Sequence, residues 1–420
     1  MKRFLPLYIM VAFLSVAQGQ RLPLKIRPDA FPPRKESSAA KESVMALTVE
    51  DMSSWDRYPT YDVYLDMMTH WAEKYATVCH VDTIGRTIQG RLILSMFIDV
   101  HPNSDRQRPG FFYSSSMHGD ELTGYVMMLR LIDTLLSGYG KNEWYTHVLD
   151  NVRVSINPLS NPDGAYFGGD STVVEAIRYN ANAVDLNRNF PDPFGTEALD
   201  ELQVENKAMI DYVSKHRFAL SANLHGGSEV MNYPWDSFSS SQQRHPLWQW
   251  WEQVCRRFVD TCRRTDRWYM SDVCSEGFIE GGDWYVIPNG RQDYMNFFLN
   301  CRELTIELST EKVLNARRLP KYWEVLNKSL VGYIEETANI PKTGITSTEN
   351  IDNVTVYPNP VHETLFIEGT NTGSIDVVDM KGNVVKTIIP GTRKVDVGSW
   401  PRGLYILRHG SWHQTIVKQK

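Results

Sequence analysis

Long apolar runs are missing from this 420-residue sequence. After the N-terminal segment, no stretch reaches about 18 uninterrupted apolar residues, the length that a membrane-spanning helix needs. An excess of positive charge is missing too. Lys and Arg number 44 against 50 Asp and Glu, for a formal net charge of −6. This balance argues against a protein held to nucleic acid or anionic lipid by bulk charge. With 42% hydrophobic and 22% charged residues, the chain has ordinary globular composition.

Cysteine is scarce and odd in number, at five, so at least one thiol stays unpaired within the chain. Cys255 and Cys262 lie on a predicted helix about two turns apart, too far to bridge each other. Cys274 and Cys301 are open to pairing with each other or with one of those two. We expect Cys79 to be a buried free thiol.

The N-terminus begins Met-Lys-Arg and continues with the apolar run 4–17 and a small-residue exit at Ala17-Gln-Gly19. This pattern predicts a secretory signal peptide over residues 1–19. The run is short for a membrane span, although a single N-terminal anchor is the alternative interpretation. Residues 20–51, with several Pro, Ser and Lys, are expected to form a flexible leader.

Strand and helix patterns alternate through the next segment, residues 52–338. The expected strands are 91–100, 109–116, 152–156, 218–224 and 304–308. The expected helices are 62–74, 122–136, 197–216, 248–264 and 321–336. Such alternation predicts an α/β sheet covered on both faces, with functional residues at the carboxyl ends of strands.

The character of the sequence changes after this segment. Residues 339–353 are polar with Pro and Gly, which is typical of a linker. Residues 354–420 contain short β-type runs separated by turns, including a hairpin signal at Lys381-Gly-Asn383. We therefore expect a small all-β, sandwich-like C-terminal domain.

Three residues suggest a metal site. His118 and Glu121 lie three apart at a strand-to-helix turn, and zinc accepts both histidine nitrogen and carboxylate oxygen. The sequence has no His-Glu-x-x-His motif, so a third ligand must come from elsewhere. His225 follows an apolar strand and precedes two glycines, which makes it the best candidate, although a structural histidine is an equal alternative.

Further polar residues occur at other strand ends. Arg178, Asp185, Asn187 and Arg188 lie in one loop, where arginine forks and amides suit recognition of a carboxylate. Glu307 interrupts an apolar strand, and a lone carboxylate there is costly unless it is paired or functional.

These segments, in this order, resemble the zinc metallocarboxypeptidases, and within them the regulatory branch related to carboxypeptidases N, E and D. The motifs that carry the resemblance are MHGDE, NPLSNPDG, VDLNRNFPD, SANLHGG with NYPWD, GGDWY with GRQDY, and ELTIELS. The resemblance covers roughly residues 55–336. It implies a mixed central β-sheet flanked by helices and an enzyme that removes one C-terminal residue from peptides.

The resemblance also implies residue roles. One Zn²⁺ per chain would be held by His118, Glu121 and His225, with Asp185 fixing the tautomer of His118. Catalysis would use Glu307 as general base and Arg178 to polarise the scissile carbonyl. The substrate would be bound by Asn187, Arg188, Tyr285, Asp236, Gln292 and, in an outlying position, Arg91.

Two of these positions bear on specificity. Asp236 and Gln292 match the residues that hold a Lys or Arg side chain in the regulatory branch, so the resemblance implies a preference for basic C-termini. Asp236 as a plain turn residue is the alternative. For the activity as a whole, a hydrolase acting on cell-wall peptides or N-acyl amino acids is a second interpretation, and a non-catalytic peptide-binding module is a third.

The C-terminal segment resembles the sorting domain read by the type IX secretion system of Bacteroidetes. The motifs are Val356-Tyr-Pro-Asn-Pro360, Asp379-Met-Lys-Gly382 and Gly403-Leu-Tyr-Ile-Leu407. This resemblance implies passage through the periplasm, contact with the type IX machinery, and release or attachment outside the outer membrane.

Overall fold

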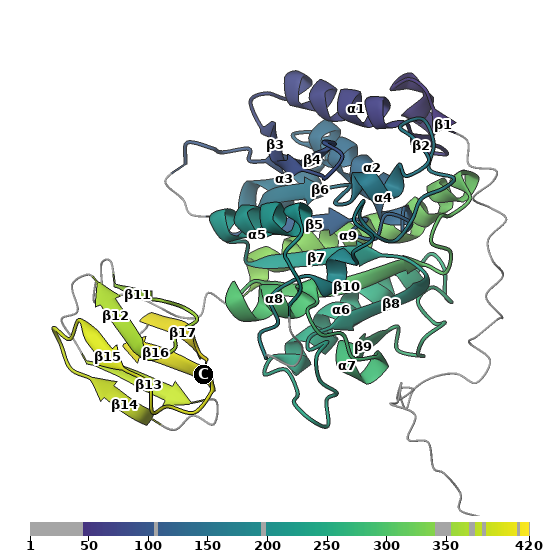
Figure 1. Cartoon of the computed structure of the whole chain (residues 1–420). Coiled ribbons are helices and arrows are strands. Elements are labelled where there is room, and N and C mark those ends of the chain that lie inside the picture. The colour runs from purple at the N-terminus through teal and green to yellow at the C-terminus, as the bar shows by residue number, and fades with distance from the viewer. Residues whose placement is uncertain are drawn as a thin grey trace, which may run out of the picture.

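A mixed sheet of eight strands, in the order β3-β4-β6-β5-β7-β10-β8-β9, organises residues 45–340 of the computed structural model (Figure 1). The structure describes residues 45–104, 108–194, 199–340, 354–368, 374–379, 384–409 and 412–419. Neighbours from β6 to β10 are parallel, whereas β4 and β8 run antiparallel to β6 and β10. The strands are β3 (Cys79–Arg86), β4 (Leu92–Ile98), β5 (Gly110–Ser115), β6 (Arg153–Asn157), β7 (Leu220–His225), β8 (Ser228–Tyr233), β9 (Phe278–Glu280) and β10 (Arg302–Ser309).

Helices cover both faces of this sheet. The larger apolar cluster joins one face to α1 (Tyr61–Lys74), α2 (Thr123–Gly138), α3 (Glu143–Asn151), α6 (Trp248–Arg263) and α9 (Leu319–Asn339). A smaller cluster joins the other face to α5 (Val204–His216) and α8 (Arg291–Phe298). The shorter elements are β1 (Met45–Ala46), η2 (Glu50–Ser54), β2 (Tyr58–Pro59), α4 (Pro162–Ala165), η3 (Leu186–Arg188), α7 (Gly281–Trp284) and η4 (Ala316–Arg318).

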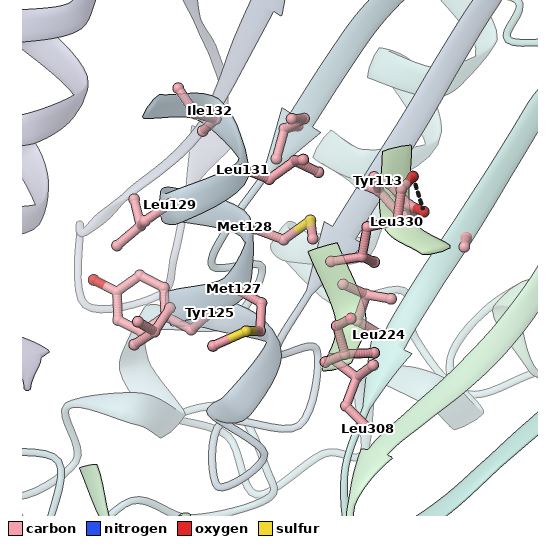
Figure 2. Packing of buried hydrophobic residues seen from close by; sticks show 14 of the residues in the cluster. Tyr113, Tyr125, Met127, Met128, Leu129, Leu131, Ile132, Leu224, Leu308 and Leu330 are labelled. Carbon is pink, nitrogen blue, oxygen red and sulfur yellow. Dashed lines mark hydrogen bonds between the residues drawn. The ribbon is translucent and has the colours of Figure 1, made fainter. Parts of the chain in front are cut away.

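Alternation along the strands decides which side chains face which layer. Figure 2 shows side chains of α2, including Met128 and Leu131, packed toward Leu224 of β7 and Leu308 of β10. Each such fully buried side chain stabilises the fold by roughly 1.5–3 kcal/mol relative to exposure. Because side chains on a strand alternate, His225 and Glu307 must point to the opposite face, which α5 and α8 cover.

The predicted α/β class and mixed sheet are confirmed, with some corrections to element bounds. The helix expected over 197–216 begins only at Val204. The described structure begins at Met45, where β1 pairs with β2, so the expectation of a flexible leader was wrong for residues 45–51. The signal peptide at 1–19, most of the leader and linker, and the hairpin turn at 381–383 lie outside the described residues.

All five cysteines are buried, and no disulfide joins any two of these described residues. Cys79 is a free thiol as expected, whereas the suggested pairing of Cys274 with Cys301 or with a helical cysteine is wrong. Cys301 lies in the apolar cluster under α5 and α8, on the other side of the sheet from Cys255 and Cys262. Burial raises the pKa of Cys79 to about 11 and that of Cys301 to about 12, so these two thiols are protonated and inert at neutral pH.

The C-terminal segment forms two antiparallel sheets, as predicted. Their orders are β11-β12-β15 and β14-β13-β16-β17. Residues of both sheets, such as Leu365 and Leu407, meet in one separate apolar cluster. The strands are β11 (Thr355–Tyr357), β12 (Thr364–Glu368), β13 (Ile375–Asp379), β14 (Val384–Ile388), β15 (Lys394–Asp396), β16 (Gly403–His409) and β17 (Trp412–Lys418). Within the described ranges, no helix has the length and apolar character needed to cross a membrane.

Candidate active site

Two neighbouring strands bring His225 and Glu307 together. His225 ends β7 and is the register partner of Glu307 in β10. The loop between β5 and α2 carries His118 and Glu121 to the same edge, and its end is held by the hydrogen bond from the Leu122 N–H to the Lys312 carbonyl, at 2.9 Å. The carboxyl ends of parallel strands thus gather residues that are far apart in sequence, as the strand pattern predicted.

His118, Glu121 and His225 form a buried cluster. Nδ1 of His118 lies 3.0 Å from both Glu121 Oε2 and His225 Nδ1, and His225 Nδ1 lies 2.8 Å from Glu121 Oε2. Among the described residues, this is the only group of three or more His, Cys, Asp or Glu whose ligand atoms all lie within 4.8 Å of one another. The structure therefore brings together the three residues predicted as metal ligands.

The donor set of this cluster suits zinc. Ligand atoms about 2.0–2.1 Å from a tetrahedral zinc are roughly 3.3 Å from one another, close to the spacings in the cluster. Burial lowers the pKa of His225 to about 4, so this ring is neutral with a free lone pair at neutral pH. Burial opposes ionisation of Glu121, but His118 and His225 hold the pKa of this carboxyl well below its usual range. Two imidazoles and one carboxylate are a ligand set found in catalytic zinc sites.

Asp185 lies behind His118, on the side of the ring away from the cluster. Its Oδ1 is 3.0 Å from Nε2 of His118, which leaves Nδ1 of that ring facing the cluster. Burial alone would raise the pKa of Asp185, but His118 and Arg178 lower it far below its usual value, so it is ionised. Such a carboxylate fixes the tautomer and orientation of a ligating imidazole.

Arg178 bridges Asp185 and the cluster. Its Nε and Nη2 lie 2.9 and 2.8 Å from Asp185 Oδ2, and its Nη1 lies 3.4 Å from Glu121 Oε1. The guanidinium is therefore fixed by a carboxylate on one side and presents its other edge to the candidate metal site.

Glu307 is buried, and its Oε2 has no hydrogen-bond partner among the described residues. Burial and the nearby charge of Glu121 raise the pKa of Glu307 well above its usual value, against the opposing effect of Arg178 and Lys312. A carboxyl with a raised pKa and an unpartnered oxygen beside a candidate metal site is suited to accept and return a proton.

Asn187, Arg188 and Tyr285 occupy the neighbouring region. The Arg188 guanidinium donates to the carbonyl of Asn187 at 2.9 Å. Burial raises the pKa of Tyr285; the charge of Glu307 raises it further, and that of Arg188 lowers it. Tyr285 therefore lies within electrostatic reach of both the predicted base and the predicted carboxylate clamp.

Asp236 and Gln292 are both buried and in contact with each other. The Gln292 amide donates to Asp236 Oδ1 at 2.7 Å, and a Cβ on Gly281 would lie 1.8 Å from that same oxygen. Asp293 accepts the N–H groups of Asp236 and Ser237, both at 2.9 Å. Burial and the charge of Asp293 raise the pKa of Asp236 well above its usual value. The charge of Arg188 opposes this rise.

Arg91 lies apart from these residues. Its guanidinium binds Asp163 at 2.8 Å and Asp170 at 2.7 Å, and no described hydrogen bond or ion pair joins it to the other predicted site residues. These ion pairs tie the segment after β3 to α4, so the contacts that Arg91 makes are structural. Its predicted contact with substrate stays a prediction.

Two residues near the site were missed in the sequence. Lys312 lies 2.9 Å from Asp120 and 3.4 Å from Glu121, and Asp293 supports the backbone of Asp236. Asp293 directly follows Gln292 on a helix, which is a usable signal. Lys312 lies in an irregular segment after β10, and no pattern in the sequence marks it as a site residue.

The fold and the cluster define an α/β protein with a candidate mononuclear metal site of the hydrolase kind. Comparison with known families makes this more specific. Residues 64–329 match the family model described as zinc carboxypeptidase, and residues 355–420 match the secretion system C-terminal sorting domain. The chain therefore belongs to the zinc carboxypeptidase family, and its residues 355–420 form a C-terminal sorting domain of the kind that the second model describes.

Relatives of the regulatory type support this placement. Carboxypeptidase M of Mus musculus is 32% identical over 286 residues, covering 63% of this chain and 62% of its own. Carboxypeptidase D of Rattus norvegicus is 31% identical over 290 residues, covering 66% of this chain. The match spans only 21% of that carboxypeptidase D chain. The catalytic chain of carboxypeptidase N from Rattus norvegicus is 27% identical, covering 81% of this chain and 80% of its own.

Solved structures share the fold. Thrombin activatable fibrinolysis inhibitor aligns with a TM-score of 0.60 at 17% identity, covering 69% of this chain and 76% of its own. Carboxypeptidase A from Helicoverpa armigera aligns with a TM-score of 0.59 at 19% identity, covering 71% of this chain and 78% of its own. At these identities the likeness concerns the arrangement of elements alone.

Proposed function

We propose that the protein is a secreted, zinc-dependent exopeptidase that hydrolyses the C-terminal peptide bond of peptides or proteins and prefers C-terminal Lys or Arg. The observation that carries the proposal is the buried cluster of His118, Glu121 and His225 beside Glu307. One zinc ion per chain would be held by these two imidazoles and one carboxylate. When bound, zinc supplies a Lewis acid that polarises a carbonyl and makes water more acidic.

The protein's own residues carry the proton and the charge. Glu307, with its raised pKa and unpartnered Oε2, accepts a proton from the attacking water and returns it to the leaving amine. Arg178, fixed by Asp185, presents Nη1 to the charge that develops on the scissile carbonyl oxygen. Asp185 holds His118 in one tautomer throughout.

The exopeptidase character follows from a carboxylate clamp. Asn187 and Arg188 would bind the terminal carboxylate, and Tyr285 would close over the terminal residue. The clamp requires that the residue on the leaving side of the cleaved bond carry a free carboxylate. Internal peptide bonds are therefore excluded. The same requirement favours a peptide C-terminus over an acyl group, which argues against a hydrolase of N-acyl amino acids.

The basic preference follows from Asp236. A carboxylate buried with only an amide donor, that of Gln292, gains a partner when a Lys or Arg side chain enters the pocket. A neutral side chain would leave this anion uncompensated or protonated. A non-catalytic binding module is disfavoured, because a site that only binds peptides would not need the proton acceptor Glu307.

Export is the second part of the proposal. The signal peptide at 1–19 would direct the chain to the periplasm, and the domain at 354–420 would engage the type IX machinery for release or surface attachment. The catalytic domain would span 52–338, joined to the tail by the linker 339–353. The family matches at 64–329 and 355–420 support this division.

The central experiment measures release of the terminal residue. The zinc-loaded mature protein is incubated with one peptide series ending in Arg, Lys, Leu or Glu, and with the same peptides amidated at the C-terminus. We expect Arg and Lys to be released fastest and amides not at all. Equal release of all four residues would refute the basic preference, and no release by zinc-loaded protein would refute the enzyme.

A further inference from the structure

The first turn of α8 touches two sides of the proposed substrate pocket. The Arg291 N–H donates to Oδ1 of Asn187 at 3.0 Å, on the carboxylate side. The Gln292 amide donates to Asp236 at 2.7 Å, and Asp293 accepts the N–H groups of Asp236 and Ser237, on the side-chain side. The position of this single turn therefore sets the spacing between the two proposed recognition groups.

The side chain of Arg291 fastens this turn to the sheet. It is fully buried, with Nη2 3.0 Å from Glu303 Oε2 in β10 and Nη1 2.5 Å from Ser114 Oγ in β5. The guanidinium also lies over the ring of Phe112, 5.2 Å from its centroid. One planar fork thus joins the helix to two strands at once, a geometry that lysine cannot reproduce.

Stability alone does not account for this buried ion pair. Nε of Arg291 and Oε1 of Glu303 have no hydrogen-bond partner among the described residues, so the desolvation of both groups is incompletely offset. Replacing such a pair by apolar residues is often neutral, whereas removing one partner is strongly destabilising. The pair is better explained by the position that it imposes on α8.

We propose that Arg291 is a positioning residue, whose buried contacts with Glu303 and Ser114 hold the first turn of α8 so that Asn187 and Asp236 receive the two ends of the substrate's terminal residue. This role rests on the proposed function of the pocket. It predicts a defect in substrate binding and none in the chemical step, because neither Glu307, held within β10 by the sheet, nor the metal cluster lies on α8.

The test compares Arg291→Met with Arg130→Met, which removes a half-buried arginine of α2 that stacks on Trp55 and Trp323. For Arg291→Met we expect KM to rise at least tenfold for peptides ending in Arg and in Leu, with kcat within about threefold. Arg291→Lys should give an intermediate KM. Arg130→Met should lower Tm without changing KM. A fall in Tm with unchanged KM for Arg291→Met would overturn the proposal.

Two further measurements separate positioning from charge balance and from failure of the enzyme itself. In the double variant Arg291→Met/Glu303→Gln we expect Tm to recover and KM to stay raised, whereas full recovery of KM would overturn the role of the tether. This variant also serves if Arg291→Met does not fold. Hydrogen exchange at the amides of Asp236 and Ser237 should accelerate in both variants; unchanged exchange overturns the proposal even if the wild type releases no residue.

Discussion

At the scale of single residues, Glu307 allows the sharpest test of the chemistry. Replacing it by Gln keeps its size and removes its ability to take a proton. We expect Glu307→Gln to retain zinc and to lose kcat by about 10²–10⁴-fold, the usual contribution of a general base. Metal content by elemental analysis and turnover at saturating peptide measure the two quantities separately.

Glu229 offers a matched control for that variant. It is a half-buried glutamate in the neighbouring strand β8. Its partial burial raises its pKa to about 7, and it accepts a hydrogen bond from the Tyr322 hydroxyl. Glu229→Gln should keep kcat within a few-fold, since Gln still accepts that bond. If both variants lost turnover equally, or if Glu307→Gln turned over normally, the assignment of Glu307 as general base would be wrong.

Asp236 gives a prediction in pH. Burial and the charge of Asp293 raise its pKa, and Arg188 opposes this. The pocket is therefore neutral at low pH and becomes anionic as pH rises through that pKa. Only the anion attracts a cationic side chain, so the ratio of kcat/KM for Arg-ending over Leu-ending peptides should increase with pH. Measuring a ratio cancels the titration of Glu307, which affects both substrates alike.

A substitution at the same residue checks this reasoning. Asp236→Asn keeps the shape of the pocket and removes its charge. We expect the Arg over Leu ratio to fall at least tenfold and to become independent of pH between about 5 and 9. A ratio that still rises with pH in Asp236→Asn would assign the titration to another group, with Asp293 as the next carboxyl in reach.

At the scale of elements, the loop that carries His118 depends on close packing against α4. A Cβ on Gly119 would lie 2.3 Å from the carbonyl carbon of Gly164, which no small shift relieves. We expect Gly119→Ala to displace His118, lowering zinc affinity at least tenfold together with Tm. Competition with a chelator and thermal unfolding measure the two effects.

Gly332 is the control for that substitution. It lies inside α9, and the nearest atom to a Cβ there would be 4.0 Å away, on Trp144. Gly332→Ala should stabilise the protein by up to about 1 kcal/mol through helix propensity, without an effect on zinc. If Gly119→Ala bound zinc as the wild type does, the close contact with α4 would not be what positions His118.

The elements also explain how far the sequence could be interpreted. Strand ends and apolar alternation located His118, His225 and Glu307, because a β-strand fixes which face each residue occupies. The sequence could not reveal that Arg291 and Glu303 pair under α8, or that Lys312 reaches Glu121, since these contacts depend on how separate elements and loops pack in three dimensions. Arg91 likewise could be placed only once its partners Asp163 and Asp170 were located.

At the scale of the whole molecule, the tail has a core of its own. Its apolar cluster is made entirely of residues from 354 onward, and the catalytic elements form other clusters. A segment with its own core is expected to fold by itself and to be dispensable for the fold of the rest. This independence is what a removable sorting domain requires.

Deleting residues 354–420 therefore should separate export from catalysis. We expect the truncated enzyme to keep kcat and KM within about twofold and to accumulate in the periplasm, measured as peptidase activity in cell fractions of a host with a type IX system.

The converse experiment uses a reporter protein. With residues 1–19 at its start and 340–420 at its end, the reporter should reach the cell exterior. Because the tail strands pair only with one another in the described residues, loss of activity on truncation would mean that the tail supports the catalytic domain directly. Surface delivery of the truncated enzyme would show that the exporting signal lies elsewhere in the chain.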